Sequence, residues 1–177
     1  FVTLTAIQTS INAEIRARVP ERAPSFFALD IPRDRAAEFS QLVQAQAPGA
    51  QINMIPSLRG TIVEFAGKRV DQMAELPEGA WVLRGDRGLT YSPTVPQGSE
   101  VSQGAWWPAD YKGPPLVSMD ERVAETLGVS VGDSLTVSVL GVEIPAKIAA
   151  LRTVKWENFG LNYALVFSPG AFDAAPH

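Results

Sequence analysis

VSMDERVAETLGVSVGDSLTVSVLGVEIPAKIAALRTVKWENFGLNYALVFSPG, residues 117–170, predicts in order a capped helix, a tight turn, a β-hairpin, a basic-aromatic run and a final apolar strand. Apolar and polar residues alternate from residue 135 to 139 and again from 142 to 148, on either side of the turn Leu140-Gly141. Such alternation is typical of half-buried strands. We therefore expect residues 117–170 to form a rigid structural module rather than a catalytic centre.

A short helix is predicted just before this hairpin. Ser118 and Glu121 fit the S-x-x-E capping box, in which each side chain satisfies a backbone amide at the other residue. Gly128 suits the left-handed position that ends many helices. The apolar residues expected to face the core are Val123, Ala124 and Leu127. The cap accounts for Asp120 and Glu121 without any acid–base role.

The first third of the chain predicts a different arrangement. Residues 3–19 carry apolar side chains at three- and four-residue spacing, which indicates either an ordinary amphipathic surface helix or the continuation of a membrane span. A β-type run at 25–31, a helix from Pro32 to about residue 48, and strands at 51–56 and 59–65 follow. This β-α-β-β order predicts an α+β layer with one helix on a sheet. The helix residues expected to be buried are Ala36, Phe39, Leu42 and Val43.

The middle of the chain is less regular, and only two short strands are expected there, at 81–83 and 88–91. Several proline and glycine residues between 93 and 115 indicate loops.

Composition narrows the classes of function. The 177-residue chain has a net charge of −4 and a pI near 5.0, which argues against a nucleic-acid surface because such surfaces need clustered Lys and Arg. The chain has no cysteine, and its single histidine is the terminal His177, so a thiolate nucleophile or a Ser-His-Asp triad has no support within it. No nucleotide-binding or zinc-protease motif is present. We expect no catalytic residue, no cofactor and no metal.

Aromatic and basic side chains are the candidates for contact with a partner or substrate. They are Trp106, Trp107, Arg152, Trp156 and Phe159. The aromatic side chains either stack on a ligand or line a lipid-facing groove, or else they pack inside the protein. Arg152 and the nearby Lys155 either contact an anionic head group or are ordinary solvated basic residues, and the same alternatives hold for Arg59.

Paired carboxylates offer a rival class, a hydrolase that uses acids such as Asp30 and Asp120. Two such groups should lie roughly 5–10 Å apart in a cleft. The structural interpretation is that Asp30 ends an apolar strand and that Asp120 belongs to the helix cap.

Six short motifs occur in a definite order along the chain. They are IPSLRGTI at 55–62, GAWW at 104–107, SMDE at 118–121, LGVSVGD at 127–133, LRTVKW at 151–156 and FSPG at 167–170. In this order, over roughly residues 24–172, they resemble the extracytoplasmic domain of FtsX-like, MacB-type ABC transporter permeases. The resemblance is to the branch associated with lysophospholipase or arylesterase export. Each motif alone is weak, and the ordered set carries the resemblance.

The resemblance implies a non-catalytic periplasmic domain inserted between the first two membrane helices of an inner-membrane permease. It implies that residues 1–19 continue a membrane span and that residues 20–60 with 160–177 form a β-α-β porter-like lobe, incomplete at its C-terminus. Residues 61–159 would form an inserted, mainly β lobe with one helix. A lobe that stops at His177 would leave an exposed sheet edge, so a dimer through that edge could be an artefact of truncation.

The partners implied are the membrane-spanning remainder of the permease and, indirectly, a cytoplasmic ATPase subunit. Motion of the membrane helices would tilt the domain, moving a hydrophobic or lipid-linked substrate or transmitting force to a partner outside the membrane. An alternative is a docking platform for a secreted esterase or lipase, with Trp106 and Trp107 as anchors. No nucleic-acid partner is expected.

Overall fold

The computed structural model describes residues 26–156, 162–173 and 175. The helix predicted at 3–19, the candidate Phe159 and the terminal His177 lie outside the described residues. Among the described residues, no helix combines the length and the apolar character needed to cross a membrane.

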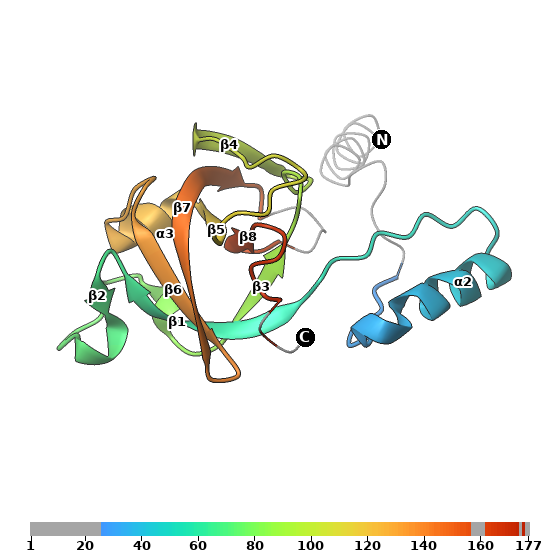
Figure 1. Ribbon diagram of the computed structural model, residues 1–177, viewed down its shortest axis with the longest axis horizontal. Coiled ribbons are helices and arrows are strands. Elements are labelled where there is room, and N and C mark those ends of the chain that lie inside the picture. The colour runs from blue at the N-terminus through green and yellow to red at the C-terminus, as the bar shows by residue number, and fades with distance from the viewer. Residues whose placement is uncertain (1–25, 157–161, 174, 176–177) are drawn as a thin grey trace, which may run out of the picture.

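The centre of the molecule is a closed ring of six strands (Figure 1). In order around the ring they are β1 (Leu58–Phe65), β3 (Arg87–Tyr91), β8 (Leu165–Phe167), β5 (Leu116–Asp120), β7 (Val142–Val154) and β6 (Ser134–Val139), and β6 pairs again with β1. The β3–β8 and β5–β7 pairs are parallel and the others antiparallel. Closure gives each ring strand two neighbours, which removes the exposed edges of an open sheet.

Two further strands extend this ring. β2 (Lys68–Arg69) forms a short hairpin with β1, and β4 (Ser99–Gly104) pairs with the last part of β7. The remaining elements are short helices: η1 (Arg33–Arg35), α2 (Ala36–Gln46), η2 (Val70–Gln72), η3 (Trp81–Leu83) and α3 (Glu121–Leu127).

The predicted hairpin is confirmed. β6 and β7 pair in antiparallel register from Ser134 opposite Lys147 to Val139 opposite Val142. The turn residues Leu140 and Gly141 both have positive φ, 48° and 83°, as a tight hairpin turn requires. The inward side chains on these strands are buried, so the alternation in the sequence identified the core face correctly. They include Leu135, Val137, Val139, Ile144, Ala146 and Ile148.

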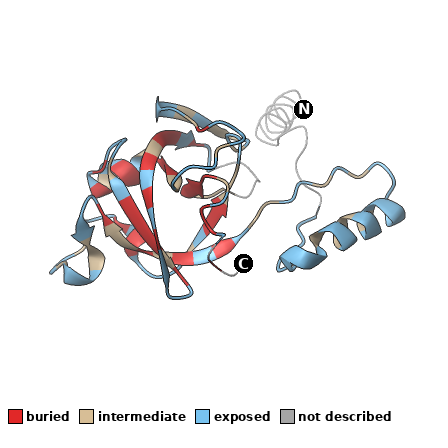
Figure 2. Cartoon of the chain, viewed as in Figure 1, coloured by how far each residue is buried: buried red, intermediate tan, exposed pale blue. Residues whose placement is uncertain are grey.

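The core fills the interior of the ring, where the buried residues concentrate (Figure 2). Close contact between strands explains why residue 60 is a glycine. A Cβ atom at this position would lie 2.7 Å from the carbonyl oxygen of Ser138 and 2.8 Å from Leu89 Cδ1. α3 packs on the barrel through the three residues predicted to be buried. Gly128, the residue directly after α3, has φ 66°, which confirms the left-handed cap.

The predicted capping box is wrong. The N-cap of α3 is Asp120, whose carboxylate accepts a hydrogen bond from the Arg122 amide at 2.9 Å. Ser118 lies two residues earlier, inside β5, because the strand continues to Asp120 before the helix begins. Its hydroxyl binds Arg152 instead.

Residues 26–57 form an arm that extends away from the barrel (Figure 1). The predicted helix is present as η1 and α2, but none of its residues is buried, so the expected burial of its apolar side is wrong. Residues 26–31 and 51–56 form no strand. Within the described residues no strand pairs with these segments through its backbone, and the contact with β3 is a side-chain one, in which the Thr90 hydroxyl donates to the Pro56 carbonyl oxygen at 2.6 Å.

Two further differences concern the middle of the chain. Residues 81–83 form the 3₁₀ helix η3 rather than a strand, and β4 arises from a segment for which no strand was predicted. By contrast, the strands predicted at 59–65 and 88–91 are confirmed and correspond to β1 and β3.

The expected lobe boundaries can be placed on this topology. Residue 60 lies within β1, and residues 165–167, from the segment assigned to the porter-like lobe, form β8 between β3 and β5. The first boundary therefore cuts through β1, whereas the second, between residues 159 and 160, lies outside the described residues. The division into a porter-like and an inserted lobe stays a prediction.

Candidate functional site

The most connected polar side chain is Arg152, at the end of β7. It is 1% exposed, and its guanidinium donates to the hydroxyls of Ser118 on β5 and Ser99 on β4. It also donates to the carbonyl oxygens of Tyr163 at 2.9 Å and Ala164 at 3.2 Å, just before β8. Arg152 thus joins β7 to β5, to β4 and to the segment before β8, and its interpretation as a solvated residue is wrong.

Asp120 is the acid associated with this arginine. The two residues are partners in the parallel β5–β7 register, and Asp120 is 3% exposed. Burial lowers the pKa of Arg152 to about 10, and the charge of Asp120 opposes that shift. Arg152 therefore stays charged at neutral pH.

Both carboxylate oxygens of Asp120 are occupied. Oδ1 accepts from the Arg122 amide, and Oδ2 accepts from the indole N–H of Trp156 at 2.6 Å. Asp30 lies in the exposed arm, and the structure does not bring it together with Asp120 in a shared pocket. The arrangement holds a helix and an indole in place and offers no paired acid and base.

Trp156 lies beside a tryptophan that was not among the sequence candidates. The Trp81 and Trp156 rings meet edge to face, with centroids 6.3 Å apart and planes at 82°. The two side chains are 47% and 40% exposed. The Arg87 guanidinium lies 5.2 Å from the Trp81 ring centroid and also donates to the Trp81 carbonyl. The sequence pattern around Trp81 predicts a strand and no contact with Trp156, and only the fold brings residues 81 and 156 together.

Trp106 and Trp107 form a separate pair. Their ring centroids are 4.1 Å apart, and their indole N–H groups donate to the carbonyl oxygens of Pro93 and Ser92 respectively. Trp107 is buried and Trp106 is partly exposed. Internal packing accounts for most of this pair, and a role in docking stays a prediction.

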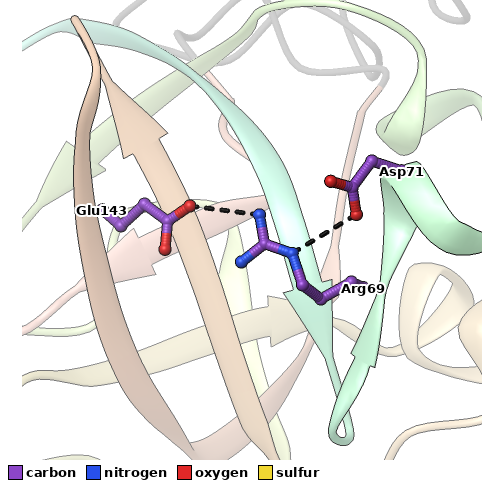
Figure 3. Close-up of polar contacts among 3 residues, drawn as sticks. All are labelled: Arg69, Asp71 and Glu143. Carbon is purple, nitrogen blue, oxygen red and sulfur yellow. Dashed lines mark hydrogen bonds and ion pairs between the residues drawn. The ribbon is translucent and has the colours of Figure 1, made fainter.

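An exposed ion-pair cluster ties the β1–β2 hairpin to β7 (Figure 3). Arg69 contacts Asp71 at 3.3 Å and Glu143 at 3.2 Å, and these two carboxylates raise the pKa of Arg69, Glu143 most strongly. Lys155, the basic candidate beside Arg152, is exposed and pairs with Glu100 at 3.6 Å. Solvent screens such pairs, so each contributes little to stability.

An open groove of about 320 Å³ lies between α3 and β4. Glu121 and Glu125 are among the residues that line it, and the Glu121 carboxylate accepts a hydrogen bond from the Thr153 hydroxyl. Within the described ranges no group of three or more His, Cys, Asp or Glu residues is placed to hold a metal ion.

Comparison with known proteins gives one informative similarity. No protein-family model matches the chain. Over 159 residues the chain is 25% identical to a protein of Escherichia coli (strain K12) described as an uncharacterized ABC transporter permease, YbbP. The similarity supports an ABC permease-like domain. It covers 90% of this chain but only 18% of the permease, so the activity and partners of a whole permease are proposals for this chain.

Proposed function

We propose that this chain is a non-catalytic, extracytoplasmic domain of an FtsX-like, MacB-type ABC transporter permease, of the branch associated with lysophospholipase or arylesterase export. The observation that carries the proposal is the similarity to a permease over nine tenths of the chain. An alignment of that length includes both the arm and most of the barrel. The ordered motifs of the sequence support the finer assignment.

The structure suggests how such a domain works. The closed barrel, with Arg152 joining strands that are distant in sequence, supplies a body that moves as a unit. The arm supplies exposed apolar side chains, including Phe26, Leu29, Leu42 and Met54, that suit contact with the membrane-spanning remainder of the permease. ATP hydrolysis by a separate cytoplasmic subunit then moves the barrel through that contact. The cargo is a hydrophobic or lipid-linked substrate or a partner outside the membrane.

The location can be tested by labelling a thiol, because this chain has no cysteine of its own. Glu78→Cys, at an exposed loop position, is introduced into the full-length permease, and intact cells are treated with a membrane-impermeant maleimide. We expect labelling without lysis. Val117→Cys, at a position 0% exposed, is the matched buried control, and the parent permease without the added cysteine reports background. Labelling of Glu78→Cys only after lysis contradicts an extracytoplasmic location.

A further inference from the structure

The turn of the β6–β7 hairpin holds an apolar side chain that suits neither the backbone nor the solvent around it. Leu140 has φ 48°, in the left-handed region that Gly, Asn and Asp adopt more readily than other residues. Its side chain is 77% exposed, and that of Val142, after the turn, is 36% exposed. An exposed leucine alone is ordinary. An exposed leucine in the left-handed region costs the fold stability, which indicates a contact outside the barrel.

An unpaired cation lies beside this turn. Arg59 on β1 is exposed, and within the described residues its guanidinium forms no ion pair. It directly precedes Gly60, where an added Cβ atom would lie 3.0 Å from Val139 Cγ2, one residue before Leu140. The cation is therefore set just behind the apolar turn.

Two carboxylates on neighbouring segments have other partners. Glu143, after the turn on β7, contacts Arg69 at 3.2 Å. Asp86, just before β3, accepts a hydrogen bond from the Thr61 hydroxyl at 2.8 Å. The charge of Arg59 thus stays available for an anion outside the protein.

The turn lies at the end of the barrel where the arm is attached (Figure 1). The arm runs directly into β1 at Leu58, and Thr61 of β1 pairs with Ser138 close to the turn. The arm is also the part that the proposed function puts in contact with the membrane-spanning remainder, and the present inference rests on that function. A barrel joined to the membrane through this end presents the turn to the bilayer.

We propose that Leu140 and Val142 enter the surface of the lipid bilayer and that Arg59 contacts the phosphate groups of anionic lipids. In a bilayer the acyl chains lie deeper than the phosphates, so an outermost apolar side chain with a cation behind it matches that order. A lipid surface accepts a projecting leucine without a complementary pocket. The contact can be weak, because the arm keeps the turn close to the bilayer and raises its effective concentration there.

The test uses the full-length permease, without other cysteines, in vesicles of phosphatidylglycerol and phosphatidylcholine. A polarity-sensitive nitrobenzoxadiazole label is attached to Leu140→Cys, and some lipids carry a nitroxide on the acyl chain. We expect blue-shifted emission that the nitroxide quenches. Ala66→Cys is the matched control, because Ala66 has φ 47° in the β1–β2 turn and its amide donates to Ser134 at the other end of β6.

The label at position 66 should not be quenched. Equal lipid quenching at the two positions overturns the proposal. Blue-shifted emission at position 140 without lipid quenching places the turn in a protein pocket and also overturns it. Arg59→Gln should lose part of the quenching in the anionic vesicles and none in phosphatidylcholine alone. If Arg59→Gln matches the parent in both kinds of vesicle, Arg59 does not contact phosphate.

A second measurement checks that Leu140 is retained at the expense of stability. In the 177-residue chain, Leu140→Asn and Ala66→Asn should both raise the urea concentration at the midpoint of unfolding, because Asn-Gly is favoured in such turns. A lower midpoint for Leu140→Asn means that the leucine serves the fold, which removes the reason for an outside contact. Thiol labelling of Glu78→Cys reports the extracytoplasmic location separately, so an accessible Glu78→Cys with an unquenched turn refutes the lipid contact alone.

Discussion

At the scale of single residues, Arg152 explains most about how the barrel wall is held. Its charge is buried, and hydrogen bonds to two hydroxyls and two carbonyl oxygens compensate for the lost hydration. Removing one member of a buried charged network leaves the others without partners, which is more costly than losing an exposed contact.

Arg152→Ala should therefore lower the free energy of unfolding by about 3–5 kcal/mol. The measurement is urea denaturation followed by tryptophan fluorescence. Lys155→Ala, three residues later and solvent-exposed, is the control and should change stability by less than about 0.5 kcal/mol. Equal effects of the two substitutions would show that Arg152 does not hold the barrel together.

A second prediction at the scale of single residues concerns the substitution of Gly60. Its backbone needs no special φ, but an added methyl group would collide with the Ser138 carbonyl oxygen on β6. Gly60→Ala should destabilise the chain by about 1–3 kcal/mol because the two strands must separate. Ser57→Ala, at an exposed position just before β1, serves as control in the same denaturation experiment. A stability equal to that of the parent chain contradicts the close packing of β1 against β6.

At the scale of elements, the sequence pattern predicted correctly those features that depend only on residues close together in the sequence. The hairpin of β6 and β7 and the buried side of α3 followed from alternation and spacing, since each is a property of a short segment. β4 was missed because its sequence, SEVSQG, has little apolar alternation, and pairing with β7 makes it a strand. The capping box failed because β5 continues through Ser118.

In the candidate site, too, the sequence identified single residues but not the contacts between residues far apart in the chain. Trp156 was identified from the sequence as a possible contact, but its neighbour Trp81 is brought near it only by the fold. The burial of Arg152 also depends on distant strands, since Ser99 and Ser118 lie 53 and 34 residues away in sequence. No periodicity in the sequence reports such contacts.

The leucines of α3 and α2 should contribute differently to the stability of the chain. Leu127 on α3 is 7% exposed, whereas Leu42 on α2 is 61% exposed. Leu127→Ala should cost about 2–5 kcal/mol of stability, because it removes buried methyl groups and leaves a cavity. The same substitution at Leu42 should change the stability of this chain by less than about 0.5 kcal/mol. Thermal or urea unfolding of both variants checks this, and a large loss for Leu42→Ala contradicts the exposed arm.

At the scale of the whole molecule, the described residues form a closed barrel and an arm that does not contribute to the barrel core (Figure 2). Among the Lys and Arg residues that the structure describes, brief trypsin treatment should therefore cleave at Arg33 or Arg35 first, because both are exposed in the arm. The cleaved barrel should keep the near-ultraviolet circular dichroism of the parent chain. Loss of that signal together with the first cleavage would mean that the arm stabilises the barrel.

The central claim is that the barrel is the moving outer part of an ATP-driven permease. It is tested most directly by measuring, in the full-length permease with its ATPase subunit, the distance between a spin label on Glu78→Cys and a second label on the membrane-spanning remainder. Electron–electron resonance spectroscopy gives that distance distribution without nucleotide and in the ATP-bound state. The account predicts that the distribution changes between the two states and that a hydrolysis-deficient ATPase subunit traps the ATP-bound one. Identical distributions in a permease that hydrolyses ATP would contradict it.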